Sequence, residues 1–546
     1  MASAAQVEHE VRPLITASVA FAAFERLVFE ARHDVFLAFR ILDPTTRLRS
    51  DGARERGLDT WADLLADAVG RGIRVRLLLS DFDAVAANRL HRMTWQSVRG
   101  FRERIPRDAD GDRFQVIAAL HEGEFGSVVR AWMWPVVRHR TAKLVESWRQ
   151  TEAGVEQKLG SSPGLWGTVT QKRERTRIAF WPPPRMWPAT HHQKLLVADG
   201  ESTILGGLDI DERRYDDPDH QREAETTWHD VSLEVRGAIA GDAERHFVDC
   251  WNREVPRFNS RLTQLGAPSP DLPDPVSPLE NGSKGRPVDR PLPSDLSFVR
   301  TRSRRRFSPL AFGPRPEIME IERACLDQIQ DCQNLLYLET QFFRSGIIAD
   351  ALCQAARKTK TLHVILVLPA APEDVVFYGH EGPGARHGEW LQVQAIDQLR
   401  QAFADRFAAF CLVRDVPGTE ENERDAVDGR QITYLHSKVS IADGRWAIVS
   451  SANLNGRSLK WDTEAGAVWR DEEGVAAFQT ALWSTHLRDG HTGEPARSAA
   501  DALSMWRQAA EPDRWQGDRR PQIAAYPLAR ARAFARRYRS VPHNMV

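Results

Sequence analysis

The chain is poor in three features that define large classes of protein. Its 546 residues include five cysteines, and none of them forms a Cys-x-x-Cys pair or stands at the His/Cys spacing of a zinc site. No stretch approaches the ~20 apolar residues that a membrane-spanning helix needs. The formal net charge is -1, whereas proteins devoted to nucleic acid usually carry a basic excess. These absences argue against a disulfide framework, a zinc site, an integral membrane protein and a dedicated nucleic-acid-binding protein.

The start of the chain lacks the basic residues that precede the apolar part of a secretory signal. The apolar run from Leu14 to Phe24 follows Glu8 and Glu10, and Phe21 and Val28 recur at the spacing of one helix face. We interpret this segment as a first helix that packs against a core. Because unpaired cysteines are typical of a reducing compartment, the sequence predicts a cytoplasmic or peripheral membrane protein with no signal peptide and no transmembrane segment.

The most informative feature that is present is a charged triplet that occurs twice. Each copy has the form His-x-Lys-x-x-x-x-Asp, with His192, Lys194 and Asp199 in the first half and His436, Lys438 and Asp443 in the second. In a chain with 17 histidines, chance produces even one such triplet in only about a few chains per hundred. Two copies therefore indicate an internal duplication.

The two copies remain similar beyond the triplets. Asp209 and Asn453 each stand 17 residues after the histidine of their copy, and two small residues precede each of them. Farther along, Asp230 and Glu464 place a carboxylate 38 and 28 residues after the respective histidine. The difference matches the length of the polar segment 216–225, which has no counterpart in the second copy.

Apolar runs alternate with helical segments in both halves, which is typical of parallel sheets covered by helices. The expected strands are 35–39, 73–79, 335–338 and 362–368, and the expected helices are 61–68, 318–329 and 347–357. Each triplet lies on a strand that ends in Asp-Gly, and its His and Lys are two residues apart, so both side chains project from one face. We therefore predict two similar α/β/α halves that pack about a pseudo-twofold axis and share one active site.

The chain divides into four expected parts: a first repeat over 1–255, an irregular linker over 256–315, a second repeat over 316–490 and a basic tail over 491–546. Within the first repeat, a mostly helical insertion over about 83–177 has no equivalent of that length in the second half. The linker is interpreted as irregular because it is rich in Pro, Ser, Asp and Arg, as in Pro268-Ser269-Pro270 and Pro291-Leu292-Pro293.

Two His-Lys pairs in one cleft supply chemistry that a single pair cannot. One imidazole attacks phosphorus to give a phosphohistidine, while the other protonates the departing oxygen and then deprotonates the incoming water or alcohol. Lys194 and Lys438 would stabilise the charge on the phosphate oxygens, and Asn453 would add an amide donor. A carboxylate at the other ring nitrogen fixes the tautomer of each imidazole, and Asp230 and Glu464 are the candidates. We expect that no metal or other cofactor is required.

The duplicated triplet resembles the defining motif of the phospholipase D superfamily. Further segments are similar to its eukaryotic-type, phosphatidylcholine-cleaving branch: Gly206-Gly207-Leu208-Asp209, Arg214-Tyr215-Asp216, Trp228-His229-Asp230, Tyr337 to Phe343, and Leu482-Trp483 with His486. The resemblance covers about two thirds of the chain. It implies two phospholipase D-like halves with one shared active site.

The resemblance also implies an activity, which is hydrolysis of glycerophospholipids to phosphatidic acid, with transphosphatidylation when an alcohol competes with water. It implies His192 as the nucleophile and His436 as acid and base, while Asp199 and Asp443 support the strand that carries each motif. The expected partners are a phospholipid membrane surface, a phospholipid substrate and a water or alcohol acceptor. We expect a monomer and no nucleic-acid partner.

Three positions depart from the family pattern. Asp209 stands where simpler members carry Asn, Ser450-Ser451 replaces the usual Gly-Ser, and the strand Ala38-Phe39-Arg40 lacks a Trp that is often found there. The first two departures leave the catalytic interpretation intact. The third concerns the shape of the substrate pocket.

Alternative functions remain open at this stage. Within the same chemistry they are a phosphatidyltransferase similar to cardiolipin synthases and a nuclease. The net charge argues against the nuclease, and the lack of membrane spans argues against a typical cardiolipin synthase. From another class, the chain could be a non-catalytic lipid-binding protein, although binding alone would not require two titratable imidazoles.

Three further features have two interpretations each. The segment from Phe180 to Pro188 is either a membrane-contacting rim beside the active site or a buried packing loop. The arginine-rich tail either attracts anionic lipid or forms a solvated helix face. Asp230 and Glu464 either orient the histidines or are capping or surface carboxylates.

Overall fold

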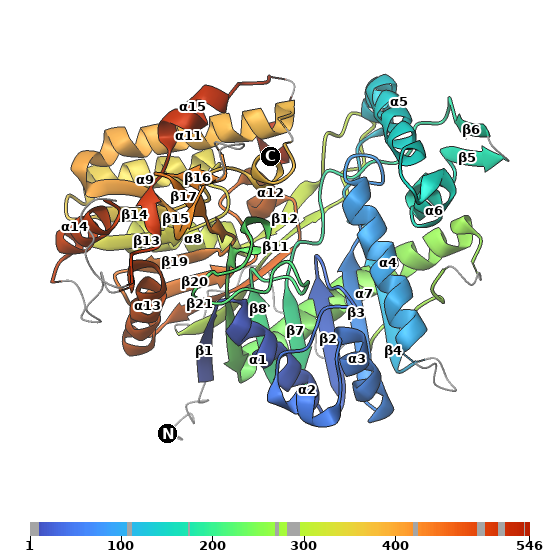
Figure 1. Ribbon diagram of the computed structural model, residues 1–546, viewed down its shortest axis with the longest axis horizontal. Helices are drawn as coiled ribbons and strands as arrows, with labels where there is room; N and C mark the ends of the chain where they lie inside the picture. Colours follow the sequence, from blue (N-terminus) through green and yellow to red (C-terminus); the bar gives the residue numbers. More distant parts are fainter. Residues whose placement is uncertain are drawn as a thin grey trace.

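A computed structural model gives an α/β protein with two large sheets that meet near the middle of the molecule (Figure 1). The structure describes residues 10–105, 112–172, 175–267, 272–280, 295–379, 381–418, 424–488, 497–511, 519–539 and 541–546. Two stretches of the expected linker, Pro268-Ser269-Pro270 and Pro291-Leu292-Pro293, lie outside these ranges. The α/β class predicted from the strand and helix alternation is confirmed.

The first sheet has seven strands in the order β1-β10-β8-β7-β2-β3-β4. They are β1 (Glu10–Ile15), β2 (Asp34–Phe39), β3 (Arg74–Ser80), β4 (Phe114–Ala119), β7 (Leu195–Ala198), β8 (Ser202–Gly206) and β10 (Val231–Arg236). β2, β3 and β4 run parallel, and β7, β8, β10 and β1 follow as antiparallel neighbours. The first triplet therefore lies at the junction of the parallel and antiparallel parts.

Helices cover both faces of this sheet. The helices of the first half are α1 (Ala17–Glu30), α2 (Asp51–Arg56), α3 (Trp61–Gly70), α4 (Asn88–Arg104), α5 (Ser127–Arg149), α6 (Gly154–Gly160) and α7 (Ala238–Leu265). Phe39 of β2 packs against Phe24 of α1, whereas Phe36 stacks on Phe247 of α7 with ring centroids 4.9 Å apart. Because side chains alternate along a strand, these contacts place α1 and α7 on opposite faces.

The second sheet repeats this strand order. Its strands are β11 (Leu296–Arg304), β12 (Arg315–Met319), β13 (Leu335–Glu339), β14 (His363–Val367), β15 (Phe407–Pro417), β16 (Ala426–Val427), β17 (Arg430–Ile432), β19 (Val439–Ala442), β20 (Trp446–Ser450), β21 (Glu464–Arg470) and β22 (Ile523–Ala525). The series β11-β21-β20-β19-β13-β14-β15 has the same order and the same strand directions as the whole first sheet. The duplication predicted from the triplets thus extends to strand order, while the pseudo-twofold axis stays a prediction.

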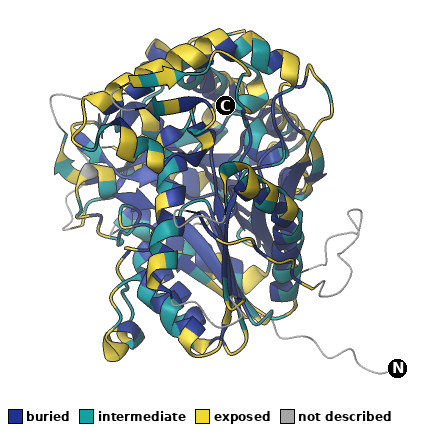
Figure 2. Cartoon of the chain, turned by 90° about the vertical axis from the view of Figure 1, so that its right-hand side faces the viewer, coloured by how far each residue is buried: buried dark blue, intermediate teal, exposed yellow. Residues whose placement is uncertain are grey.

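Helices also flank the second sheet, and one core runs through both halves. These helices are α8 (Glu320–Asp331), α9 (Gly346–Lys358), α10 (Glu373–Val376), α11 (Pro383–Phe403), α12 (Gly456–Lys460), α13 (Glu472–Leu487), α14 (Ala499–Ala509) and α15 (Leu528–Phe534). β8 contacts β20 and β21, and a continuous set of buried apolar residues includes Leu205 of the first sheet and Val449 of the second. The buried strands lie inside an envelope of helices with exposed outer faces (Figure 2). Within the described residues, no helix combines the length and hydropathy needed to cross a membrane.

Two segment boundaries differ from the expectation around the first repeat. The expected insertion begins too early. β4 is the edge strand of the first sheet, and α4 precedes it, as α11 precedes the corresponding strand β15 of the second sheet. The extra segment begins only after β4 and comprises α5, α6 and the hairpin of β5 (Val169–Lys172) and β6 (Arg175–Ile178). At the start of the chain, Leu14 and Ile15 end β1, which pairs with β10, so the first helix begins only at Ala17.

The expected linker and tail are also more regular than their composition indicates. α7 continues past Pro256 to Leu265, and β11 is an inner strand of the second sheet. In the tail, Trp506 of α14 is fully buried and lies 5.4 Å from the ring of Tyr337, while β22 pairs with β15. Phe534 is buried beneath the guanidinium of Arg386. The described part of the tail is therefore packed on the second half.

The aspartate of each triplet ties a hairpin to a neighbouring strand. Asp199 has a φ of 54° and accepts hydrogen bonds of 2.8 Å from the backbone N–H groups of residues 32–34, at the start of β2. Asp443 has a φ of 52° and accepts bonds of 2.8 to 2.9 Å from residues 333–335, at the start of β13. Aspartate tolerates this left-handed conformation better than most residues. Both aspartates thus hold the start of a neighbouring strand, which is the position that the family resemblance implies, and neither lines the cavity described below.

Replacing Asp199 with Ala should lower the free energy of unfolding by about 1 kcal/mol, because three backbone N–H groups, one of them partly buried, lose their acceptor. Urea denaturation followed by circular dichroism measures the change, and Asp443→Ala should behave alike. Asp199→Asn is the matched control, since it keeps one carbonyl acceptor and the left-handed preference, and it should lose less. Equal stability of Asp199→Ala and the wild type would contradict the supporting role.

Candidate active site

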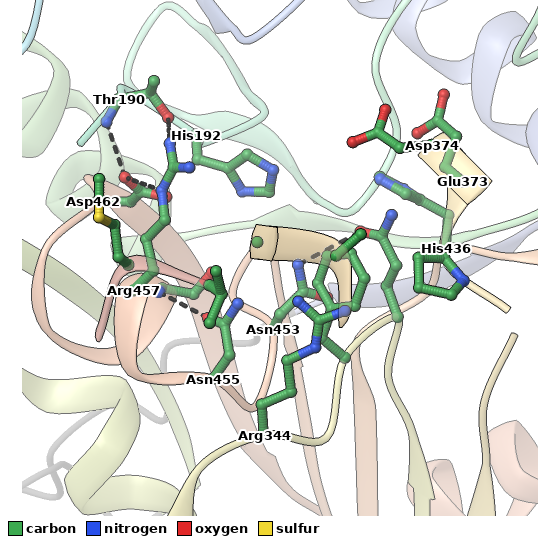
Figure 3. Close-up of a pocket in the computed structure, with 18 of the residues that line it drawn as sticks. Thr190, His192, Arg344, Glu373, Asp374, His436, Asn453, Asn455, Arg457 and Asp462 are labelled. Carbon is green, nitrogen blue, oxygen red and sulfur yellow. Dashed lines mark hydrogen bonds and ion pairs between the residues drawn. The ribbon is translucent and has the colours of Figure 1, made fainter. Parts of the chain in front are cut away.

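The two triplets meet at one cavity between the two halves. The cavity measures about 370 Å³, and both His192 and His436 line it. Figure 3 shows the two imidazoles on opposite sides of this space. The other polar residues that line it include Arg40, Thr190, Gln341, Arg344, Glu373, Asp374, Asn453, Asn455, Arg457, Ser458 and Asp462. The predicted convergence of the two copies on one site is thus present in the structure.

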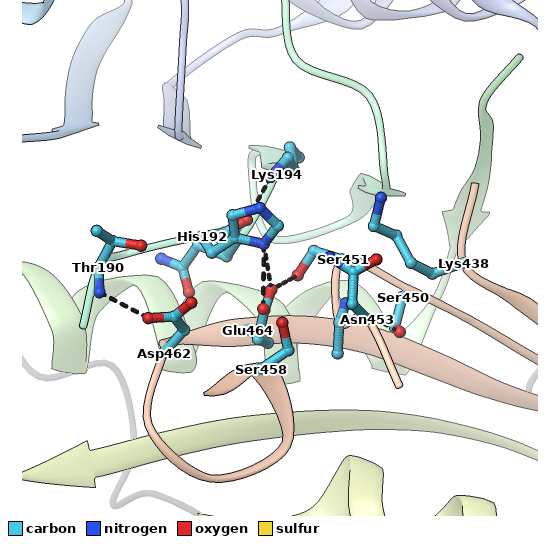
Figure 4. Close-up of polar contacts among 12 residues, drawn as sticks. Thr190, His192, Lys194, Lys438, Ser450, Ser451, Asn453, Ser458, Asp462 and Glu464 are labelled. Atoms are coloured by element: carbon cyan, nitrogen blue, oxygen red, sulfur yellow. Dashed lines mark hydrogen bonds and ion pairs between the residues drawn. The ribbon is translucent and has the colours of Figure 1, made fainter. Parts of the chain in front are cut away.

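Each catalytic-motif histidine is hydrogen-bonded to a carboxylate from the other half. Nδ1 of His192 lies 3.0 Å from both carboxylate oxygens of Glu464, as Figure 4 shows. Nδ1 of His436 lies 2.7 Å from Oδ2 of Asp230. All four residues are buried. Asp230 and Glu464 therefore lie where a group that orients the imidazole must lie, and neither is a surface carboxylate.

Backbone pairing sets the register of these contacts. The N–H of His192 donates to the carbonyl of Thr463 at 2.8 Å, and Thr463 precedes Glu464. In the same way, the N–H of His436 donates to the carbonyl of His229 at 2.8 Å, and His229 precedes Asp230. The second contact belongs to a short parallel pair of β9 (Trp228–His229) and β18 (Tyr434–Leu435). The same backbone arrangement thus occurs twice, once on each side of the cavity.

The small residues after each triplet make room for these carboxylates. Gly207 lies against the carboxylate of Asp230, so that a side chain at this position would collide with it. At the same offset in the second copy, Ser451 donates a hydrogen bond of 2.5 Å to Glu464. Ser451 thus adds a donor to the carboxylate that binds His192, whereas the departure from the family pattern lies at Ser450.

The two lysines are held in equivalent ways. Nζ of Lys194 donates to the carbonyl of His192 at 2.6 Å, and Nζ of Lys438 donates to the carbonyl of His436. Both lysines are almost fully buried. Burial lowers the pKa of Lys438 to about 7 and also lowers the pKa of Lys194, whose charge Asp209 favours. Two ammonium groups are thus confined beside the imidazoles.

Burial favours the neutral forms of the four paired groups: it raises the pKa of the two carboxyl groups and lowers that of the two imidazoles. Burial raises the pKa of Glu464 to about 8 and that of Asp230 to about 6. Burial, together with the nearby lysines, lowers the pKa of His192 and of His436 well below the ordinary range. Both imidazoles are therefore neutral near pH 7, which is the form that a nucleophile requires.

The remaining predicted residues divide into two positions. Asn453 lines the cavity, where its Nδ2 donates to Gln341 at 3.3 Å. Asp209 is buried behind the cavity wall, accepts a bond of 2.9 Å from the N–H of Ile41 and lies 3.8 Å from Nζ of Lys194. Asn453 can thus face a substrate directly, whereas Asp209 acts on Lys194.

Several cavity residues were not predicted from the sequence. Arg40 stands on the strand that lacks the family's Trp and lines the cavity with Arg344 and Arg457. Arg457 is held by Asp462 at 2.9 Å, and the guanidinium of Arg344 lies over the ring of Phe342 at 4.0 Å. Three guanidinium groups thus line the cavity, whereas Lys194 and Lys438 are not among its lining residues. Isolated arginines at strand and loop ends carry no sequence pattern that would have identified them.

Acidic side chains lie on the His436 side of the same space. Figure 3 shows Glu373 and Asp374 near His436, across the cavity from Arg457. Glu373 is bound by Arg213 at 2.7 Å, whereas Asp374 is exposed to solvent. On the His192 side, Asp462 is buried and bound by Arg457, so Asp374 is the exposed carboxylate among these three.

A buried polar network supports the second triplet from behind. The carboxylate of Glu339 accepts hydrogen bonds from the hydroxyl of Tyr337 at 2.5 Å, from Nε2 of His486 at 2.8 Å and from Ser437, which lies between His436 and Lys438. His229 lies 3.4 Å from the same carboxylate. Although burial alone would raise it, His229 and His486 hold the pKa of Glu339 well below its usual range. The network connects Ser437 to His229 and thereby holds the neighbours of His436 and Asp230.

Three members of this network also have the geometry of a metal site. Within the described residues, His229, Glu339 and His486 bring one ligand atom each to within 4.8 Å of one another. Hydrogen bonds from two hydroxyl groups and an imidazole already satisfy both oxygens of Glu339. The arrangement therefore fits a hydrogen-bonded support, and the expectation that catalysis requires no metal stays a prediction.

Comparison with known proteins agrees with this geometry. A family model described as "Cardiolipin synthase, PLD-like domain" matches residues 325–485. Phospholipase D1 of Schizosaccharomyces pombe is 25% identical over 391 residues, which cover 57% of this chain and 26% of that protein. Phospholipase D zeta 2 of Arabidopsis thaliana is 23% identical over 460 residues, covering 56% and 43%. The chain spans less than half the length of both relatives.

A solved structure aligns with most of the chain at low identity. The phosphatidylserine synthase of Haemophilus influenzae Rd KW20 aligns over 88% of this chain and 86% of that chain, with 12% identity and a TM-score of 0.47. The fold and site themselves define an α/β protein in which duplicated His-Lys pairs share one cavity. Together with the family model and the curated relatives, they identify the chain as a member of the phospholipase D superfamily, with a resemblance to its eukaryotic phospholipases D.

The pairing of each histidine with a carboxylate of the other half can be tested without measuring enzyme activity. Asp230→Ala should release the Nδ1–H tautomer of His436 and leave His192 unaffected, because each imidazole loses its acceptor only when the opposite half is changed. Nitrogen chemical shifts of histidine-labelled protein report the tautomers, with His436→Asn for assignment. Glu464→Ala is the reciprocal variant and should affect only His192. A tautomer change of His192 in Asp230→Ala would contradict the pairing.

Proposed function

We propose that this protein is a phospholipase D-type phosphodiesterase that hydrolyses glycerophospholipids to phosphatidic acid and a free head group. The observation that carries the proposal is the cavity in which two neutral imidazoles face one another, each bound at Nδ1 by a carboxylate from the opposite half. A binding protein would gain nothing from two histidines that are held in this way. The phospholipase D names of the curated relatives support the choice of substrate class.

In the first step, Nε2 of His192 attacks phosphorus, a P–N bond forms and the P–O bond to the head group breaks. His436 gives its proton to the departing head-group oxygen. An anionic phosphodiester in the cavity raises the pKa of His436, since a negative charge favours the protonated imidazole. In the second step, His436 takes a proton from water, whose oxygen attacks phosphorus and releases His192. An alcohol in place of water gives transphosphatidylation.

The cationic side chains stabilise charge during both steps. Arg457 lines the space where the phosphate oxygens gain charge, while the buried Lys194 and Lys438 are bound to the carbonyls of the two histidines, and the partly desolvated environment strengthens the attraction. Asn453 adds a neutral donor at the cavity wall. We assign the nucleophile to His192 and acid and base catalysis to His436, following the family resemblance. No step requires a metal ion.

The main alternative is a phosphatidyltransferase of the same superfamily. The matching family model carries the name cardiolipin synthase, and the same phosphohistidine would then be attacked by a lipid alcohol. The geometry accommodates either acceptor, because His436 activates water and alcohols alike. A nuclease or a non-catalytic lipid-binding protein has less support, since neither accounts for both the curated relatives and the two supported imidazoles.

Product analysis tests the proposal directly. Mixed phospholipid vesicles incubated with the wild type and ethanol should yield phosphatidic acid and phosphatidylethanol, because a phosphatidyl-enzyme partitions between water and alcohol. His192→Ala and His436→Ala should each reduce both products by at least about a hundredfold, the lower end of the contribution of general acid–base catalysis. Thermal melting of each variant confirms folding. Folded wild type without either product would contradict the proposal, and transfer to lipid alcohols alone would favour the synthase.

The pH dependence of catalysis provides a second test. Because burial lowers the pKa of Lys438 to about 7, its phosphate-binding charge is present below that pH and lost above it. Arginine keeps its charge at all these pH values. The ratio of kcat/KM for Lys438→Arg to that of the wild type should therefore rise with pH above about 7, since kcat/KM reports groups of the free enzyme. For Lys194→Arg, the matched control, the ratio should change less. A constant ratio for Lys438→Arg would contradict the assignment.

A further inference from the structure

Most of the exposed large apolar side chains of the described residues gather on three segments of the first half and the connector. They are Val128, Trp132 and Val136 on α5, Phe180 and Trp181 after β6, and Phe307, Leu310 and Phe312 after β11. We call these eight side chains the apolar face. Phe307 is 88% exposed, Phe180 76%, Trp132 67% and Trp181 63%, so these rings are largely free of protein contacts. Such a concentration marks an interaction surface.

Direct contacts fix the three segments to one another. The indole N–H of Trp134 donates to the carbonyl of Phe180 at 2.6 Å, which joins α5 to the second segment. The ring centroids of Trp132 and Phe312 are 6.5 Å apart, and the N–H of Val128 donates to the carbonyl of Pro309 at 3.0 Å. The apolar face is therefore one continuous and ordered surface. Its main helix, α5, lies at the top right of Figure 1.

The fold does not need these side chains for its own core. The inner side of α5 already buries Val129, Trp134 and Val137, which pack with Phe125 and Met186 in a separate apolar cluster. The helix is thus apolar on two sides, and only one side is covered by protein. The outward side has a role that the packing of α5 does not explain.

The three segments that carry the apolar face contain basic residues and no acidic ones. Residues 127–144, 177–188 and 304–315 contain four, two and four lysines or arginines respectively, and no aspartate or glutamate. The whole chain, in contrast, has 74 basic and 75 acidic residues. Glu317 and Glu124 neutralise Arg304 and Arg305 in part, while Arg138 and Arg306 are exposed. A surface with anionic groups above an apolar interior complements this pattern.

The apolar face is connected to the catalytic cavity. The segment that carries Trp181 runs on to Thr190 and His192, which line the cavity. Met545 also lines the cavity, and it packs on the inner apolar cluster of α5. A surface that binds the apolar face would therefore lie close to the cavity in which we propose that the phosphodiester is cleaved.

We propose that the apolar face docks the protein on a bilayer that contains anionic phospholipids and so brings the cavity to lipid head groups. The role in catalysis rests on the proposed function, whereas the docking itself does not. A second copy of this chain is a poorer occupant, because two such faces would place basic residues opposite one another. Aromatic rings enter the interface between head groups and acyl chains, and the arginines contact lipid phosphates.

Flotation with vesicles tests the docking without turnover. His192→Ala protein serves as background, so that the lipid is not consumed, and vesicles of phosphatidylcholine alone are compared with vesicles that also contain phosphatidylglycerol. Combined Trp132→Ser, Trp181→Ser and Phe307→Ser should lower the partition coefficient by about tenfold or more, since three large apolar side chains no longer leave water. Combined Arg138→Glu and Arg306→Glu should weaken binding mainly to the anionic vesicles.

Matched controls carry similar changes elsewhere on the surface. Ile347→Ser on α9 removes an exposed apolar side chain and Arg54→Glu on α2 reverses an exposed charge, and both should bind vesicles as the background protein does. Absence of vesicle binding, or equal binding of the apolar-face variants and the controls, would overturn the proposal. So would a dimer in sedimentation that the same substitutions dissociate. If the wild type forms products but the apolar-face variants bind vesicles normally, only the docking proposal fails. If the apolar-face variants lose vesicle binding but the wild type forms no products, only the proposed function fails.

Discussion

The structure depends on one interaction that occurs twice: each half supplies the carboxylate that binds the histidine of the other half. Glu464 binds the imidazole of His192, and Asp230 binds that of His436, in each case through a backbone contact at the preceding residue. Burying a polar or ionisable group without a partner destabilises a protein by several kcal/mol, so these pairs tolerate little displacement. Neither half holds a complete site alone. The continuous core and the cross-half strand pairing are what keep the two pairs in register.

This pairing across the halves also sets the electrostatic state of the cavity. Burial raises the pKa of both carboxylates and lowers the pKa of Lys438, so the empty site favours forms of low charge. A phosphodiester brings a negative charge into this space and favours the protonated forms of lysine and imidazole. Under the proposed function, binding of the substrate and protonation of His436 would be coupled, and the titration belongs to the cluster more than to any one residue.

The sequence indicated the two His-Lys pairs, but much less of what surrounds them. The repeated triplets identified the His-Lys pairs because strand alternation places residues two apart on one face. The offsets of 38 and 28 residues suggested two carboxylates, but only the tertiary structure assigns Asp230 to His436 and Glu464 to His192. α4 was assigned to an insertion because it has few aliphatic residues, and Arg40 and Arg344 stand alone in their segments. Contacts between distant segments, which no local pattern encodes, decide these features.

The two halves carry the same motif residues, but they differ in the segments that border the cavity. In the described residues, α5 and the aromatic segment before His192 belong to the first half, whereas Glu373 and the exposed Asp374 lie beside His436 (Figure 3). A lipid held by its acyl chains at a basic, apolar surface would approach from the His192 side. Its head group would then extend toward His436, where the acidic residues favour a cationic amine. This direction would place the phosphatidyl group on His192 and the leaving oxygen at His436, in agreement with the roles that we propose for the two histidines.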